Sequence, residues 1–224
     1  YLKQLGVSHV QIMPMYDYGS VDETGDLSYN AQGAQNWGYD PENYNVPEGS
    51  YSSDPSDPAS RVTEMKQMVK GLHENDIRVI MDVVYNHVYN AANHSFNKTV
   101  PGYYFRYDDN GSLVNNSGCG NDTASERKMM RKHIVDSVTY WAKNYNVDGF
   151  RFDLMGLIDT ETMKEVRAAL DEIDPSIIIL GEGWDMNTTM DEGEMTIQPN
   201  AYQVASDGTN NGIAFFNDSV RDGL

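Results

Sequence analysis

Three apolar segments of this sequence each end in a carboxylic acid. Asp82, Asp153 and Glu182 stand at or near these ends. If the segments are parallel strands, their carboxyl ends lie on one rim of the sheet, where α/β proteins place their chemistry. Two carboxyl groups on either side of a glycosidic bond can hydrolyse it, because one attacks the sugar carbon while the other protonates the leaving oxygen. The three acids therefore indicate a catalytic site for glycoside hydrolysis.

The residues next to two of these acids suit different catalytic roles. Arg151 precedes Asp153 by two positions, so both side chains point to the same side of a strand. A cation there would hold Asp153 ionised, as a nucleophile requires. Glu182 stands between two glycines and close to Trp184, and partial burial would raise its pKa and keep it protonated as an acid. Two structural alternatives remain open: Asp153 could cap a loop and pair with Arg151, and Glu182 could be a loop carboxylate.

The pattern of apolar residues predicts the strands and helices that must position these acids. Strands are expected over residues 7–13, 77–84, 147–152 and 176–180. Helices are expected to begin at Asp57-Pro58, at a capping box over residues 123–126, and at Asp159 or Thr160. A further helix is expected after Phe215, with Asn217 or Asp218 as its cap. Long polar loops over residues 15–58, 85–121 and 185–213 follow strands and are expected to carry function.

The order of these elements predicts a parallel α/β sheet, because strands alternate with helices. An open doubly wound sheet and a (β/α)8 TIM barrel both fit this order. No glycine-rich phosphate loop follows the first strand, which disfavours a nucleotide-binding sheet. A full barrel has eight strands and about 250 residues. We therefore expect residues 1–224 to be the central part of one barrel domain, truncated at both ends, with about four of the eight strands and long loops at the C-terminal face.

The composition limits the partners of the protein. The 34 acidic and 16 basic residues give a net charge of −18, which disfavours nucleic acid and anionic membrane surfaces. No apolar run is long enough to span a bilayer. The single Cys119 excludes an internal disulfide framework and a cysteine zinc cluster. The sequence leaves the oligomeric state unknown and the compartment open between extracellular and cytoplasmic.

Several motifs, in the right order along the whole chain, resemble the α-amylase superfamily, glycoside hydrolase family 13. The segments that resemble its first three signature regions are Asp82-Val-Val-Tyr-Asn-His87, Gly149-Phe-Arg-Phe-Asp153 and Gly181-Glu-Gly-Trp184. Asn36-Trp-Gly-Tyr-Asp-Pro41 and Phe215-Phe-Asn-Asp218 resemble segments of its starch-debranching members, the type I pullulanases. The resemblance implies a (β/α)8 catalytic domain of a glycoside hydrolase.

The resemblance also implies roles for individual residues. Asp153 matches the nucleophile, Glu182 matches the general acid/base, and Arg151 matches the arginine beside the nucleophile. Tyr39 matches the tyrosine that stacks on the attacked sugar, and Asp82 and His87 match polar residues of the same subsite. Trp184 matches an aromatic wall on the leaving-group side. For Trp184, simple packing remains an alternative. The implied reaction is hydrolysis of α-1,6 branch linkages in pullulan, amylopectin and limit dextrins, with retention at the anomeric carbon, so an α-glucan is the expected partner. Two alternatives remain: an α-1,4-glucan hydrolase of the same superfamily, and a non-catalytic α-glucan-binding fragment.

The sequence departs from the family pattern in two places. The fourth signature region, a strand ending in His-Asp, is not found, so we expect the chain as given to lack one catalytic aspartate. Leu154-Met155-Gly156 follows the expected nucleophile, where α-amylases carry Lys-His and use that histidine in binding calcium. No cofactor is therefore expected to be required. Calcium has no clear site, although Asn86 matches another calcium ligand of α-amylases and residues 191–194 form an acidic loop.

Overall fold

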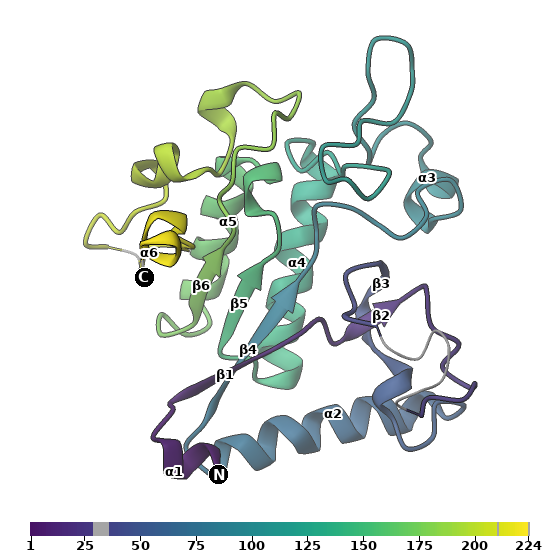
Figure 1. Ribbon diagram of the computed structural model, residues 1–224, viewed down its shortest axis with the longest axis vertical. Coiled ribbons are helices and arrows are strands. Elements are labelled where there is room, and N and C mark those ends of the chain that lie inside the picture. The colour runs from purple at the N-terminus through teal and green to yellow at the C-terminus, as the bar shows by residue number, and fades with distance from the viewer. Residues whose placement is uncertain (29–35, 210, 224) are drawn as a thin grey trace.

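A five-stranded parallel sheet forms the centre of the molecule (Figure 1). The structure, a computed structural model, describes residues 1–28, 36–209 and 211–223. Across the sheet the strands are β1 (His9–Ile12), β4 (Arg78–Val83), β5 (Gly149–Phe152), β6 (Ile178–Gly181) and β7 (Ala214–Phe215). Every neighbouring pair is parallel, which confirms the predicted α/β sheet. The sequence predicted about four strands, and the structure adds a fifth, β7, whose two residues are too few to show a pattern in the sequence.

Three long helices follow β3, β4 and β5 along the chain and agree with the predicted apolar faces. They are α2 (Pro58–His73), α4 (Lys128–Tyr145) and α5 (Thr160–Asp171). Asp57 caps α2 by accepting a hydrogen bond from the Ala59 N–H at 3.0 Å, and Asp159 caps α5 through the Thr162 N–H at 2.9 Å. In Figure 1, α4 and α5 lie side by side along β5 and β6, whereas α2 runs past the amino end of β4.

The predicted start of α4 at a capping box over residues 123–126 is wrong. The helix begins at Lys128, and its N-cap Arg127 makes no side-chain cap. The Thr123 hydroxyl instead donates to the carbonyl oxygen of Tyr85 at 2.5 Å, and the Ser125 hydroxyl accepts from the Asp159 N–H at 3.0 Å. Thr123 and Ser125 are almost completely buried. Tertiary contacts at the end of β4 therefore take the groups that a local cap would need.

The core lies between the sheet and its helices. β5 is buried along its whole length, and β4 is buried except at Arg78, as expected for strands with both faces covered. Trp141, Phe150 and Phe152 are among the largest fully buried side chains. In contrast, β1 is only partly buried, because it is an edge of the sheet.

The long loops predicted from the sequence contain short elements of their own. Residues 15–58 include an antiparallel pair of strands, β2 (Tyr16–Tyr18) and β3 (Pro41–Pro47), and a 3-10 helix, η1 (Gly49–Tyr51). Part of this segment, residues 29–35, lies outside the described residues. The remaining short helices are α1 (Leu2–Leu5), α3 (Ser95–Thr99), η2 (Met155–Leu157), η3 (Glu192–Glu194), η4 (Gln198–Gln203) and α6 (Asp218–Asp222). Asn217 caps α6, as the sequence predicts. Figure 1 shows the loops after β4 and β6 extending beyond the carboxyl ends of the strands. Among the described residues, no helix combines the length and the apolar character that crossing a membrane requires.

Candidate active site

The sheet brings the charged residues predicted from the sequence to one rim. Asp82 and Arg151 are cross-strand partners in the register of β4 and β5. The Asp153 N–H donates to the Val83 carbonyl at 2.9 Å, which extends the ladder by one residue beyond β5. The Glu182 N–H donates to the Phe152 carbonyl at 3.1 Å and does the same beyond β6. The strand backbones thus fix the starting point of each side chain.

The guanidinium group of Arg151 contacts three carboxylates. Its Nη1 lies 2.9 Å from Asp82 Oδ1 and 3.0 Å from Asp153 Oδ1, and its Nη2 forms an ion pair with Glu182 Oε1 at 2.6 Å. Burial lowers the pKa of Arg151, but the three carboxylates outweigh this effect and raise that pKa above its usual value. Asp153 and Glu182 therefore lie on either side of one permanently charged group.

Asp82 differs from the other two acids because it is almost inaccessible, with 1% of its side chain exposed. Burial raises its pKa to about 6, against the opposing effects of Arg151 and of a hydrogen bond from Tyr39. The Tyr39 hydroxyl donates to Asp82 Oδ2 at 2.8 Å, although the two residues are 43 positions apart in the sequence. The Tyr39 ring also lies beside Arg151, with 5.9 Å between the ring centroid and the guanidinium carbon. Tyr39 therefore belongs to the same cluster as the carboxylates.

His87 and Asn86 connect Tyr39 to Asp153. The Nε2 atom of His87 lies 2.8 Å from the carbonyl oxygen of Tyr39, and its Nδ1 lies 2.6 Å from Asn86 Oδ1. The Asn86 amide nitrogen donates to the carbonyl oxygen of Asp153 at 2.8 Å and to its Oδ2 at 3.0 Å. Both His87 and Asn86 are buried, and burial lowers the pKa of His87. The amide of Asn86, which the sequence suggested only as a possible calcium ligand, thus orients Asp153.

The turn after Asp153 contacts Glu182 directly. The Leu154 N–H donates to Glu182 Oε2 at 3.1 Å. Leu154 has a φ of 42°, in the left-handed region that is unfavourable for a side chain with a Cβ atom. Two residues on, Gly156 lies under the loop after β6, where a Cβ atom would meet the carbonyl oxygen of Trp184 at 1.9 Å. The two chain segments that carry Asp153 and Glu182 are therefore packed against each other.

Two aromatic residues follow β6 and β7 in the sequence, and one of them, Phe216, lies against the cluster. Trp184 is partly exposed on the loop after Glu182. Phe216 was not selected as a site residue from the sequence, yet its ring centroid lies 5.6 Å from the guanidinium carbon of Arg151. Phe216 directly follows β7 and is 38% exposed. Recognition of β7 as a strand would have placed Phe216 at the end of a rim strand, in the same position as the acids.

An acidic cluster away from this rim offers oxygen ligands of the kind that calcium prefers. The carboxylates of Asp17, Glu23 and Glu48 lie within 4.8 Å of one another. However, Arg61 Nη2 is 2.5 Å from Glu23 Oε2, and Arg61 Nη1 is 4.0 Å from Asp17 Oδ1. Glu48 accepts hydrogen bonds from the backbone of Tyr18 and Ser50. These ion pairs and hydrogen bonds thus connect the β2–β3 pair to α2, and the cluster assigns no calcium site.

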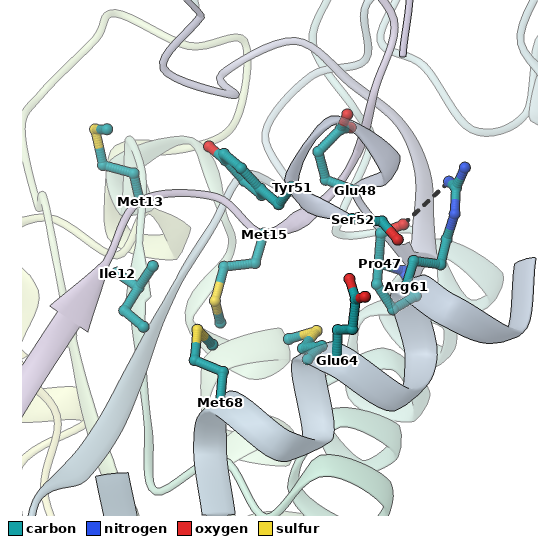
Figure 2. Close-up of a pocket in the computed structure, with 11 residues that line it drawn as sticks. Ile12, Met13, Met15, Pro47, Glu48, Tyr51, Ser52, Arg61, Glu64 and Met68 are labelled. Carbon is teal, nitrogen blue, oxygen red and sulfur yellow. Dashed lines mark hydrogen bonds between the residues drawn. The ribbon is translucent and has the colours of Figure 1, made fainter. Parts of the chain in front are cut away.

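An apolar cavity of about 390 Å³ lies beside this acidic cluster (Figure 2). It is bordered by the end of β1, by η1 and by α2, and Figure 2 shows the Met15 and Met68 side chains pointing toward one another across it. None of the rim carboxylates lines it. The cavity is therefore separate from the candidate active site.

The chain is similar to a group of known glycoside hydrolases. A family model described as the catalytic domain of alpha amylase matches residues 1–110. Pullulanase of Bacillus subtilis (strain 168) is 47% identical over 224 residues, which is 100% of this chain and 30% of that protein. Pullulanase 1, chloroplastic, of Arabidopsis thaliana is 37% identical and matches 99% of this chain, again over only 26% of its own length.

Solved structures agree with these relatives. A crystal structure of pullulanase from Paenibacillus barengoltzii in complex with maltohexaose and alpha-cyclodextrin superposes with a TM-score of 0.92 at 51% identity, covering 99% of this chain and 33% of the other. Pullulanase from Anoxybacillus sp. LM18-11 complexed with maltotetraose gives the same TM-score at 54% identity, over 99% of this chain and 31% of the other. The chain thus spans about a third or less of the length of the relatives it matches. The five parallel strands are part of a TIM barrel, residues 1–110 match the alpha-amylase catalytic-domain family, and the chain over its whole length is similar to pullulanases.

Proposed function

We propose that the protein carrying this chain hydrolyses α-1,6 branch linkages in α-glucans such as pullulan, amylopectin and limit dextrins. The observation that supports this most is the single Arg151 guanidinium between Asp153 and Glu182. A retaining glycosidase needs two carboxyl groups about 5–5.5 Å apart, facing the same sugar. Groups on either side of one guanidinium fit such a spacing. The similarity to pullulanases, some of them solved with bound maltooligosaccharides, supports the choice of an α-glucan as substrate.

In this proposal the residues of the rim act in two steps. A carboxylate oxygen of Asp153 attacks the anomeric carbon while Glu182 gives its proton to the leaving oxygen, which forms a covalent glycosyl–enzyme. Glu182 then takes a proton from water, whose oxygen displaces Asp153 and restores the original anomeric configuration. Arg151 and the Asn86 amide both donate to the Asp153 carboxylate and so hold the nucleophile in position. Tyr39 and His87, with Asp82, form the wall beside the attacked sugar, and Trp184 forms the wall on the leaving-group side.

Residues 1–224 are, in the same proposal, part of one catalytic domain. Turnover requires no organic cofactor, because the two carboxyl groups fill both chemical roles. The chain supplies two acids of a catalytic trio, and the third aspartate comes from a strand outside residues 1–224.

The test is to exchange each acid for its amide in the complete enzyme and to measure maltotriose released from pullulan. Asp153→Asn and Glu182→Gln are expected to lower turnover by about 10⁴-fold, while the thermal unfolding midpoint changes little. Asp191→Asn and Glu192→Gln are matched controls, because both residues are exposed on the loop that also carries Glu182. Retained turnover in either rim variant contradicts the assignment. Products with intact α-1,6 bonds would instead favour the α-1,4-hydrolase, and wild-type binding without cleavage would favour the non-catalytic alternative.

A further inference from the structure

Asn116, on the loop after β4, holds the loop that follows Glu182 and Trp184. Its side-chain Nδ2 donates to the carbonyl oxygens of Met186 at 3.1 Å and Asn187 at 2.7 Å. Residues 185–190 form neither helix nor strand, so their carbonyl groups have no partner in regular secondary structure. One amide group therefore fixes two successive peptide units of an otherwise irregular loop.

Asn116 is itself held by a buried acid. The Asn116 N–H donates to Asp122 Oδ2 at 3.0 Å, and the next residue, Ser117, donates its N–H to Asp122 Oδ1 at 2.9 Å. Asp122 is fully buried. The following residue, Thr123, donates its N–H to the carbonyl of Asn86, the residue that orients Asp153. A continuous set of hydrogen bonds thus runs from the proposed nucleophile to the loop on the opposite side of the site.

Arg106 contacts the far end of the same loop. Its side chain is almost completely buried and forms an ion pair with Glu126 at 2.8 Å. From there its Nη1 lies 3.4 Å from the Thr188 hydroxyl oxygen and its Nη2 lies 3.1 Å from the sulfur of Met190. The loop after β6 is therefore held at residues 186–187 and again at residues 188–190, both times from the segment that follows β4.

Glu182 does not depend on these tethers. Its backbone is fixed by the Phe152 carbonyl, and its carboxylate is fixed by Arg151 and the Leu154 N–H. The part of the loop that does depend on Asn116 begins after Trp184. A change at Asn116 should consequently leave the proton donor in place and move residues 185–190, which continue the loop from Trp184 on the side of the leaving sugar.

We propose that Asn116 is a positioning residue for the leaving-group side of the active site: it holds the loop after Glu182 where a glucan chain on that side is recognised. This inference rests on the proposed function. It assigns to Asn116 an effect on substrates whose leaving group is a sugar chain, and none on substrates whose leaving group is a single atom. In α-maltotriosyl fluoride the departing fluoride occupies no sugar subsite and needs little protonation.

The experiment compares Asn116→Asp with Asn115→Asp in the complete enzyme. Aspartate at 116 has the same shape but lacks both N–H donors and faces two carbonyl oxygens. Asn115 uses its side-chain oxygen to accept from the Gly120 N–H at 2.6 Å, so Asn115→Asp keeps that contact while adding the same charge to the same loop. For Asn116→Asp we expect kcat/KM on pullulan to fall about ten-fold or more and kcat/KM on α-maltotriosyl fluoride to stay within about two-fold. Asn115→Asp should leave both values unchanged.

Two results would overturn the inference. One is an equal fall on both substrates, which would make Asn116 a general structural residue, and the other is no fall on pullulan. Hydrogen exchange of peptides over residues 185–190 gives a readout that does not need activity, and Asn116→Asp should speed it relative to Asn115→Asp. If the wild-type enzyme does not cleave pullulan, the proposed function is refuted. If Asn116→Asp leaves hydrogen exchange over residues 185–190 unchanged, the positioning role of Asn116 is refuted independently of the proposed function.

Discussion

Replacing Arg151 with methionine should destabilise the protein and abolish turnover, because methionine keeps much of the volume and removes the charge. Three carboxylates would lose their cation, and Asp82, with 1% of its side chain exposed, could not be rescued by water. The pKa of Asp82 is already about 6 instead of 3.8 with Arg151 in place, a difference that corresponds to about 3 kcal/mol against its charged form. Removing one partner of a buried ion pair typically costs about 3–5 kcal/mol. We expect a loss of that size at pH 8.

The same variant should respond to pH in a defined direction. Without Arg151, the pKa of Asp82 in the folded protein rises further above its value in the unfolded chain. The folded state then binds more protons than the unfolded state between those values, so the variant gains stability as the pH falls. The loss relative to wild type should therefore be smaller at pH 5 than at pH 8. Turnover should not recover at pH 5, because the variant still lacks the donor that holds the Asp153 carboxylate in place.

Urea denaturation of the complete enzyme, followed by tryptophan fluorescence at both pH values, measures the stability effect, and pullulan hydrolysis measures turnover. Arg167→Met is the matched control, because Arg167 is also a buried arginine but pairs only with Asp171, at 2.7 Å, away from the rim. That control should lose stability and keep turnover. The reasoning is refuted if Arg151→Met unfolds at the wild-type urea concentration at pH 8, or if it retains more than about a tenth of wild-type turnover.

Three further predictions concern single groups. Gly156→Ala should lower the unfolding midpoint and the turnover, because its Cβ atom would lie 1.9 Å from a backbone oxygen. Gly71→Ala, with open space around it in the last turn of α2, should instead stabilise the protein by up to about 1 kcal/mol. Tyr39→Phe removes the 2.8 Å hydrogen bond to Asp82 and should cost about 1–3 kcal/mol in thermal or urea unfolding; an unchanged midpoint would contradict a stabilising role for that bond. Asp82 and Asp17 both have a pKa of about 6 in the folded protein against 3.8, so wild-type stability from these groups should fall as the pH rises from about 4 to 6, and Asp17→Asn should flatten that slope in unfolding curves.

The local elements were predictable because their information is local. Apolar periodicity and side-chain caps identified α2 and α5, with Asp57 and Asp159 as the residues before their first turns. The capping box over residues 123–126 predicted the wrong helix start, because the use of its side chains depends on residues far away in the sequence. Its sequence is a good cap, but the Thr123 hydroxyl is used by Tyr85 and that of Ser125 by Asp159, contacts that no short pattern can show.

The sequence by itself determined that acids end neighbouring strands, because strand order and alternation place Asp82, Asp153 and Glu182 on one rim. Only the tertiary structure decided how their side chains are used. Asn86 turns its amide to Asp153, Phe216 joins the rim from a two-residue strand, and Asn116 reaches the loop after β6. These contacts join loops that have no repeating pattern and are far apart in sequence. Their geometry follows from where the sheet holds the loop ends and from which buried polar groups still need a partner, and both exist only in the folded chain.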